Sequence, residues 1–287
     1  MKPFAKYKAF LDLHHQSGPF VLPNAWDAAS AKAFQNCGFK AVGTTSAGIA
    51  MTLGYPDGEH LPFETLLSVL KTITDAVDIP VSADLEAGYG QSPETVAENM
   101  KKAAAAGVVG INIEDGTKDP CRPLCDATLM EEKITAVKKL NLPVLINART
   151  DVYWLNADDP GSRLQTAVRR ANRYRQAGAD CIFIPGADDT GTIAGLRKGI
   201  SGPLNVLAGS NTPSLQVLSE LGIERISCGS APFRAALSLV KKIGEDIIRR
   251  GTFNHMTDGV LSYGEAADWI SLHRDPKKIV DRNSSVC

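Results

Sequence analysis

Residues 103–116 read AAAAGVVGINIEDG, and this stretch contains the pattern that decides the fold. A helical run ends at Gly107, because glycine readily adopts the left-handed backbone that is common after a last helical turn. The apolar, β-branched run Val108–Glu114 then has the composition of a buried strand. The same order of helix, glycine and strand recurs at Gly38, Gly178 and Gly222. The chain is therefore predicted to alternate helices with parallel strands.

Eight strands are predicted from such runs. They are Phe20–Pro23, Lys40–Thr44, Val81–Asp84, Val108–Glu114, Val144–Ala148, Cys181–Pro185, Leu204–Leu207 and Arg225–Cys228. The helical stretches between them include Asp27–Cys37, Phe63–Ala76, Pro93–Ala106, Leu129–Leu140 and Arg163–Ala177. Eight such units predict an α/β fold of the (β/α)8 TIM-barrel type. A doubly wound open sheet is the alternative, and the lack of G-x-G-x-x-G after the first strand disfavours it.

The whole chain, residues 1–287, is predicted to form a single barrel domain. Residues from about 232 to 287 contain a further helical run, Arg234–Arg250, and then a polar tail. We expect this part to be a helical C-terminal extension.

Composition excludes several classes of protein. The 287 residues carry 31 Lys and Arg against 32 Asp and Glu, so the formal net charge is −1 and there is no basic excess to bind nucleic acid or an anionic membrane. No signal peptide or membrane-length apolar run is visible. The six cysteines are scattered and suggest neither disulfides nor a zinc site. A reduced, cytoplasmic location is expected.

Acidic side chains gather where predicted strands end, which is where barrel enzymes place their chemistry. Asp84 and Glu86 follow the third strand, and Glu114 ends the fourth. Three carboxylates at one rim repel one another unless a cation holds them, and oxygen ligands suit Mg²⁺ or Mn²⁺. The alternative is that each acid caps a helix or pairs with a neighbouring base, which is less favoured for three acids on adjacent strands.

Two further features belong to the same rim. Arg149 ends the fifth strand and suits a substrate carboxylate or a developing oxyanion, although it could instead pair with Asp115 or Asp151. Thr44–Gly48 offers hydroxyls and backbone N–H groups with little bulk, as in an anion cradle or an ordinary tight turn. No lysine ends a strand, which disfavours Schiff-base chemistry.

Six segments in this order resemble the isocitrate lyase/phosphoenolpyruvate mutase superfamily. They are Leu22–Asp27, Thr44–Gly48, Gly54–Asp57, Asp84–Gly90, Ile113–Asp115 and Ala148–Asp151. The resemblance implies a (β/α)8 barrel with a helix that swaps between partners in a homodimer or homotetramer. It also implies Mg²⁺ and a small-molecule 2-oxo acid whose pyruvyl part becomes an enolate.

The resemblance also implies roles for single residues. Asp84 resembles the direct metal ligand, and Glu86 and Glu114 would reach the ion directly or through water. Asp57 matches a mobile-loop aspartate that approaches the substrate or metal-bound water. Substrate contacts are implied for Thr45, Ser46, Ala47, Arg149 and Asn205, with Arg149 stabilising the enolate.

Departures from the family pattern narrow the range of reactions that the sequence predicts. Isocitrate-type lyases carry a Lys-Lys/Arg-Cys-Gly-His loop after the strand-four glutamate, whereas here Lys118 and Cys121 stand without the Gly-His. Those lyases also place a glutamate after the proline that ends strand six, where this chain has Gly186. Lys118 could replace a lysine of the phosphonomutase loop, and Cys121 could contribute a base.

The retained residues serve any cleavage beside a 2-oxo acid. We favour a Mg²⁺-dependent lyase that decarboxylates an oxaloacetate-like acid, followed by carbon–carbon cleavage of a substituted malate. Phosphonopyruvate or phosphoenolpyruvate P–C chemistry and a (methyl)isocitrate-type lyase are further alternatives. A barrel that binds a 2-oxo acid without turnover is the alternative from another class of protein.

Overall fold

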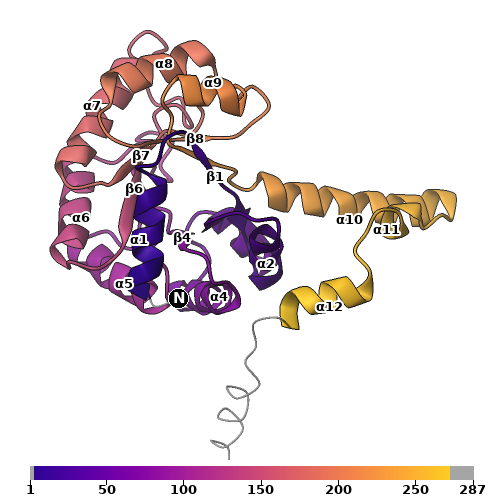
Figure 1. Cartoon of the computed structure of the whole chain (residues 1–287). Helices are drawn as coiled ribbons and strands as arrows, with labels where there is room; N and C mark the ends of the chain where they lie inside the picture. The colour runs from indigo at the N-terminus through magenta and orange to yellow at the C-terminus, as the bar shows by residue number, and fades with distance from the viewer. Residues whose placement is uncertain (1–2, 272–287) are drawn as a thin grey trace, which may run out of the picture.

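The computed structural model describes residues 3–271, in which strands alternate with helices as predicted (Figure 1). All nine strands are parallel and follow the order β1-β9-β8-β7-β6-β5-β4-β3-β2. Their bounds are β1 Phe20–Leu22, β2 Asn24–Ala25, β3 Val42–Thr44, β4 Val81–Asp84, β5 Gly110–Glu114, β6 Leu145–Arg149, β7 Cys181–Phe183, β8 Leu204–Leu207 and β9 Arg225–Ser227.

The two strands at the ends of this order are two halves of the predicted first strand. β1 pairs with β9, whereas β2 pairs with β3, and only Pro23 separates the two. Proline has no N–H to donate to a ladder, so the strand is interrupted there. The chain from Phe20 to Ala25 thus joins both edges of the sheet. The prediction of a (β/α)8 TIM-type barrel is confirmed.

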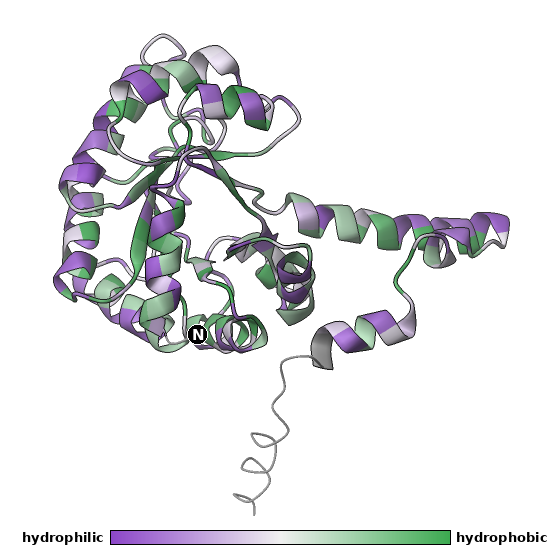
Figure 2. Ribbon diagram, in the orientation of Figure 1, coloured by the Kyte–Doolittle hydropathy of each residue, from purple (hydrophilic) through white to green (hydrophobic). Residues whose placement is uncertain are grey.

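Helices surround the strands (Figure 2). The strands are mostly hydrophobic, whereas the helices carry both hydrophobic and hydrophilic residues. Their bounds are α1 Pro3–Leu13, α2 Ala28–Asn36, α3 Ser46–Thr52, α4 Phe63–Ala76, α5 Pro93–Ala105, α6 Ala127–Lys139, α7 Arg163–Gln176, α8 Thr190–Gly199, α9 Leu215–Glu220, α10 Ala231–Arg250, α11 Asn254–Thr257 and α12 Tyr263–Ser271. The five helices named from the sequence agree with α2, α4, α5, α6 and α7 to within two residues. Among the described residues, no helix has the length and apolar character needed to cross a membrane.

Helix α1, which the sequence pattern did not reveal, closes the amino-terminal end of the barrel. Phe10 is fully buried there in a cluster with Phe20, Leu22 and Val109. A Cβ atom added to Gly110 would lie 2.5 Å from the Phe10 ring, so this glycine is needed for the close approach of the helix. Residues 103–116 therefore provide both strand β5 and, at Gly110, the space for the Phe10 ring, which plugs this end of the barrel.

Helices α10 to α12 extend from the barrel as an arm (Figure 1). The arm covers residues 231–271 and corresponds to the described part of the predicted extension, and residues 272–287 lie outside the described part. Phe233, in the first turn of α10, packs edge-on against Trp26 with 5.5 Å between ring centroids. This contact anchors the base of the arm to the barrel.

We expect Phe10→Ala to lower the free energy of unfolding by about 3–5 kcal/mol, because it leaves a cavity in the plug. Urea denaturation followed by circular dichroism measures this loss. Phe4→Ala is the matched control on the same helix, since Phe4 is 68% exposed, and it should change stability by less than about 0.5 kcal/mol. Equal losses in both variants would contradict the role given to Phe10.

Candidate active site

A cavity of about 140 Å³ opens at the carboxyl ends of the strands. Of the predicted site residues, it is lined by Thr45, Ser46, Ala47, Asp57, Asp84 and Arg149. The tertiary structure thus brings together residues that are 104 positions apart in the chain, from 45 to 149. Trp154, Phe183 and Leu207 add an apolar wall. Polar groups at the carboxyl end of a parallel barrel are the usual setting of a barrel active site.

A second, wider cavity of about 390 Å³ lies beside α1 and the segment that enters β6. Its lining is mainly apolar, and its one charged residue, Lys138, is 2.9 Å from Asp180. The smaller cavity at the carboxyl ends is therefore the better candidate for catalysis.

Asp84 and the segment Thr45–Ala47 form the centre of the candidate site. The Ser46 N–H and hydroxyl both donate to Asp84 Oδ2, at 3.2 and 2.9 Å. The Asp84 N–H donates to the Thr44 hydroxyl at 3.0 Å. The other carboxylate oxygen, Oδ1, is buried and has no hydrogen-bond partner among the described residues. A buried carboxylate oxygen without a partner is costly unless a ligand completes it.

The expected cradle turns out to be the start of helix α3. Thr45 caps this helix, and its side chain accepts a hydrogen bond from the Gly48 N–H at 3.3 Å. A Cβ atom added to Gly48 would lie 2.7 Å from the Thr45 side chain and 3.4 Å from Phe233 Cβ. The base of the arm therefore packs directly against the cradle.

Glu86 is buried and connects the Asp84 loop with the Asp57 loop. Its Oε1 accepts hydrogen bonds from the Glu59 N–H at 2.9 Å and from the Tyr89 hydroxyl at 3.2 Å. Glu59 in turn accepts from the Tyr89 N–H at 2.8 Å. Burial raises the pKa of Glu86 to about 7, the Glu59 N–H opposes the rise, and the charges of Asp84 and Asp57 add to it.

Glu114 and Arg149 form an ion pair at the same rim. Arg149 Nη1 lies 2.8 Å from Glu114 Oε2, and its other nitrogens donate to Asp151. The rings of Trp154 and Phe183 lie 5.9 and 5.7 Å from its guanidinium. Burial opposes the charge, but Glu114 and Asp151 hold the pKa of Arg149 above its ordinary value. Arg149 is therefore a fixed cation, oriented by two carboxylates.

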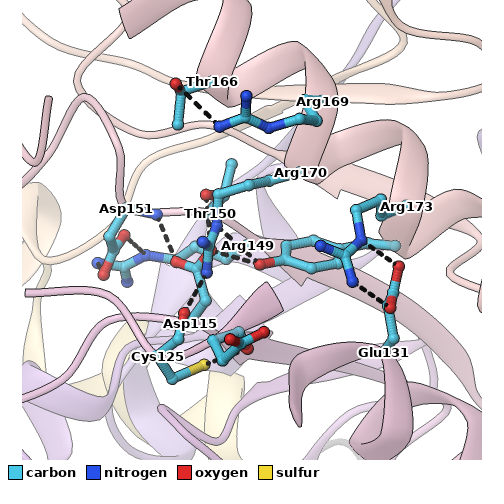
Figure 3. Close-up of polar contacts among 12 residues, drawn as sticks. Asp115, Cys125, Glu131, Arg149, Thr150, Asp151, Thr166, Arg169, Arg170 and Arg173 are labelled. Carbon is cyan, nitrogen blue, oxygen red and sulfur yellow. Dashed lines mark hydrogen bonds and ion pairs between the residues drawn. The ribbon is translucent and has the colours of Figure 1, made fainter. Parts of the chain in front are cut away.

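Asp115 fixes the backbone that carries this pair (Figure 3). It is fully buried and accepts hydrogen bonds from the Thr150 hydroxyl at 2.7 Å and the Asp151 N–H at 2.9 Å. Arg170 and the Tyr174 hydroxyl donate to it at 2.7 and 2.6 Å. From the sequence, Arg149 could pair with Asp115 or with Asp151. In the structure it pairs with Asp151 and also with Glu114.

The remaining predicted residues lie at different depths. Asp57 is on the exposed rim loop, where desolvation and the nearby Asp84 raise its pKa. Lys118 is exposed and 3.6 Å from Glu86, and Cys121 is exposed and outside the cavity lining. Asn205 is fully buried and does not line the cavity either. Both polar atoms of its side chain lack partners among the described residues.

Several residues that line the cavity were not predicted from the sequence. Asn112 lines the cavity floor, where its Oδ1 accepts from Asn147 at 2.8 Å and from the buried Arg225 at 3.3 Å. Asn24, in β2, links this strand to the turn after β9 because its Oδ1 accepts from the N–H groups of Cys228 and Gly229. The signal for Asn112 was a polar residue within the apolar run Val108–Glu114, whereas Asn24 follows the predicted strand Phe20–Pro23. Arg234 also lines the cavity and had no such signal.

Within residues 3–271, no three His, Cys, Asp or Glu side chains are clustered closely enough to ligate one metal ion together. Glu86 and Glu114 are at the predicted rim, but their oxygens face Glu59 and Arg149. The arrangement fits an ion that is bound directly by Asp84 Oδ1, with Glu86 and Glu114 acting at longer range.

A parallel barrel with acids, an arginine and a small cavity at its carboxyl-end rim has the arrangement of TIM-barrel enzymes. The family model described as phosphoenolpyruvate phosphomutase matches residues 10–248. The chain belongs to this family, within the isocitrate lyase/phosphoenolpyruvate mutase superfamily of lyases and mutases, which confirms the resemblance seen in the sequence.

Relatives support the same assignment. An uncharacterized protein of Mycobacterium tuberculosis H37Rv, Rv1998c, is 40% identical over 231 residues, which is 80% of this chain and 84% of the relative. A 2-methylisocitrate lyase of Aeropyrum pernix is 27% identical over 268 residues, which is 90% of this chain and 85% of the lyase. A Burkholderia cenocepacia J2315 protein assigned provisionally to the lyases or mutases has a TM-score of 0.87 and 35% identity, covering 94% of this chain and 96% of the other.

The raised pKa of Glu86 predicts a pH-dependent stability for the metal-free protein. Because the folded-state pKa of about 7 exceeds the ordinary value of 4.5, the stability contribution is complete below about pH 4.5 and is lost as pH rises through about 7. Glu86→Gln keeps the acceptor oxygen without the charge, so it should remove about 3 kcal/mol of this decline. Urea denaturation with a chelator at about pH 5 and about pH 8 measures it.

The matched control is Glu220→Gln, an exposed glutamate at the end of α9. This control should retain the full decline of the wild-type protein. A parallel decline in Glu86→Gln and the wild type would contradict the effect assigned to Glu86.

Proposed function

We propose that the protein is a Mg²⁺-dependent lyase that cleaves a bond beside the oxo group of a 2-oxo acid, or the hydroxyl of a 2-hydroxy acid, through a pyruvate-type enolate. The favoured reactions are decarboxylation of an oxaloacetate-like acid and carbon–carbon cleavage of a substituted malate. The observation that carries this proposal is the buried Oδ1 of Asp84, which has no hydrogen-bond partner in the described part of the chain and shares one cavity with Ser46 and Arg149.

Asp84 would hold the metal through Oδ1, with Glu86, Glu114 and Asp57 reaching it through water. Oxygen-only ligation suits Mg²⁺, and Mn²⁺ prefers the same donors. When bound, the ion supplies Lewis-acid chemistry by withdrawing charge from the oxygens of the 2-oxo acid. The raised pKa values of Asp57, Glu86 and Glu114 have burial as their main cause and nearby carboxylates as another, which supports a cation at this rim.

The chain's own residues would bind and orient the substrate. The Thr45–Ala47 segment would hold the pyruvyl carboxylate and oxo oxygen. Arg149 would oppose the negative charge that develops as the bond breaks, and Glu114 and Asp151 keep its guanidinium in place for this. The Trp154 and Phe183 rings beside it limit the access of water. Asp57, on the rim loop, would serve as the acid or base.

The alternatives differ in what they need from this cavity. A (methyl)isocitrate-type lyase would place a glutamate at position 186. Gly186 has a φ of 85°, and an added Cβ atom would lie 3.0 Å from the backbone of Tyr153 and Trp154. A side chain is thus disfavoured there, which supports decarboxylation or simpler carbon–carbon cleavage. P–C chemistry would use Lys118, which faces Glu86 outside the cavity lining.

The test is pyruvate release, with and without Mg²⁺, from oxaloacetate, 2-methylisocitrate, dimethylmalate and phosphonopyruvate. We expect turnover of oxaloacetate or dimethylmalate that a chelator abolishes. Arg149→Gln should lower kcat by about 100-fold or more, since it removes the charge opposite the developing anion. Full activity in chelator would contradict the metal assignment.

Cys121→Ser is the control variant for this experiment. Cys121 is exposed and outside the cavity lining, so we expect little change in kcat. A large loss would favour the isocitrate-type lyase. If 2-oxo acids bind and none of the four compounds is converted, the protein is a binding barrel and the proposed enzyme function is wrong.

We further propose that the arm, α10 to α12, joins copies of this chain into a homodimer or homotetramer, with α10 swapped between partners. The arm carries exposed apolar side chains, including Leu237 at 55%, Val240 at 63% and Ile248 at 86%. Apolar residues that recur along an extended helix favour burial against a partner.

Ile248→Glu should therefore shift the protein toward monomer, because it places a charge in the apolar face of the arm. Sedimentation velocity of the full chain measures the change. Lys242→Glu is the matched control on the same helix and should leave the assembly intact. A monomeric wild-type protein would contradict the role of the arm.

A further inference from the structure

Arg234 lies in the first turn of α10 and lines the candidate active-site cavity. We propose that Arg234 binds a second carboxylate of the substrate and thereby selects dicarboxylic 2-oxo or 2-hydroxy acids. This inference rests on the proposed function, in which the cradle and Arg149 handle the pyruvyl part.

The charges of the cavity lining leave Arg234 available to a ligand. The charged residues that line the cavity are Asp57, Asp84, Arg149 and Arg234. Arg149 is already paired with Glu114 and Asp151. Arg234 forms no ion pair with any residue of the described chain, 3–271. A guanidinium without an ion-pair partner among these residues can donate charge-assisted hydrogen bonds to a carboxylate.

Packing at the base of the arm fixes where Arg234 stands. The preceding residue, Phe233, is 9% exposed and packs against Trp26. Phe233 Cβ would also contact a side chain at Gly48, so the first turn of α10 adjoins the cradle segment. Arg234 thus starts from a rigid backbone beside the position proposed for the pyruvyl head of the substrate.

The charges around the cavity favour a carboxylate over a phosphonate as the second group. One guanidinium matches the single charge of a carboxylate and can donate two parallel hydrogen bonds to it. A phosphonate with two charges would need a second cation, and Lys118 is engaged near Glu86 at 3.6 Å, outside the cavity lining. The apolar wall of Phe183 and Leu207 offers no charged partner for it.

The test compares ligands that differ only in the second group. Calorimetry of the full chain with Mg²⁺ would measure the binding of lactate, malate and phosphonolactate, with oxalate as a probe of the pyruvyl position. We expect malate to bind about 10- to 100-fold more tightly than lactate and more tightly than phosphonolactate. Arg234→Gln should reduce the preference for malate over lactate to less than about threefold and leave oxalate binding unchanged.

Two further variants make the result specific. Arg234→Lys should restore part of the preference for malate, because it keeps the charge. Arg249→Gln changes an exposed arginine further along the same helix, 3.9 Å from Glu245, and should behave as the wild type.

The outcomes separate this inference from the proposed function. If oxalate binds but Arg234→Gln keeps the malate preference, or weakens all ligands equally, Arg234 does not read the second carboxylate. A tighter complex with phosphonolactate than with malate would overturn the choice of carboxylate. If oxalate does not bind to the wild type with Mg²⁺, the proposed function is wrong and this inference falls with it.

Discussion

The candidate site depends on the ion pairs that the Arg149 guanidinium forms with Glu114 and Asp151. Asp84 and Glu86 lie at the same rim of the barrel. Burial raises the pKa values of Glu86 and Glu114, and the charge of Asp84 adds to the rise. Arg149 offsets part of the repulsion between these carboxylates. The rim still carries more carboxylates than cations, in a protein whose net charge is only −1.

The register of the parallel strands creates this arrangement. Asp84 on β4 lies opposite Asn112 on β5, and Glu114 on β5 lies opposite Arg149 on β6. Strands in a closed barrel end at a common rim, so residues far apart in the chain meet there. Asp115, one residue beyond β5, then secures the turn after β6 through Thr150 and the Asp151 N–H. The charged groups are held by strands and by the turns directly after them, so their positions are set before a substrate binds.

Much of the fold was predictable because its signals are local. Glycine after several of the helices, together with β-branched runs, identified every strand, and only the break at Pro23 was missed. Helix α1 was not predicted, since its role depends on the contact between Phe10 and Gly110 across the barrel. In the site, Asp84, Arg149 and Thr45–Ala47 reached the cavity as expected. Asn205 and Cys121 do not line it, because strand depth and loop path are not encoded locally.

The barrel, the acidic strand ends and the family resemblance were predictable from the sequence alone, because periodicity, turn residues and motif order are properties of neighbouring residues. Which of those groups are paired, and which remain available to a ligand, depends on the packed structure. The packed structure pairs Glu114 with Arg149, leaves Asp84 Oδ1 without a hydrogen-bond partner within residues 3–271, and brings Arg234 to the cavity. These outcomes depend on distances between separate elements, and only the closed and packed chain fixes such distances.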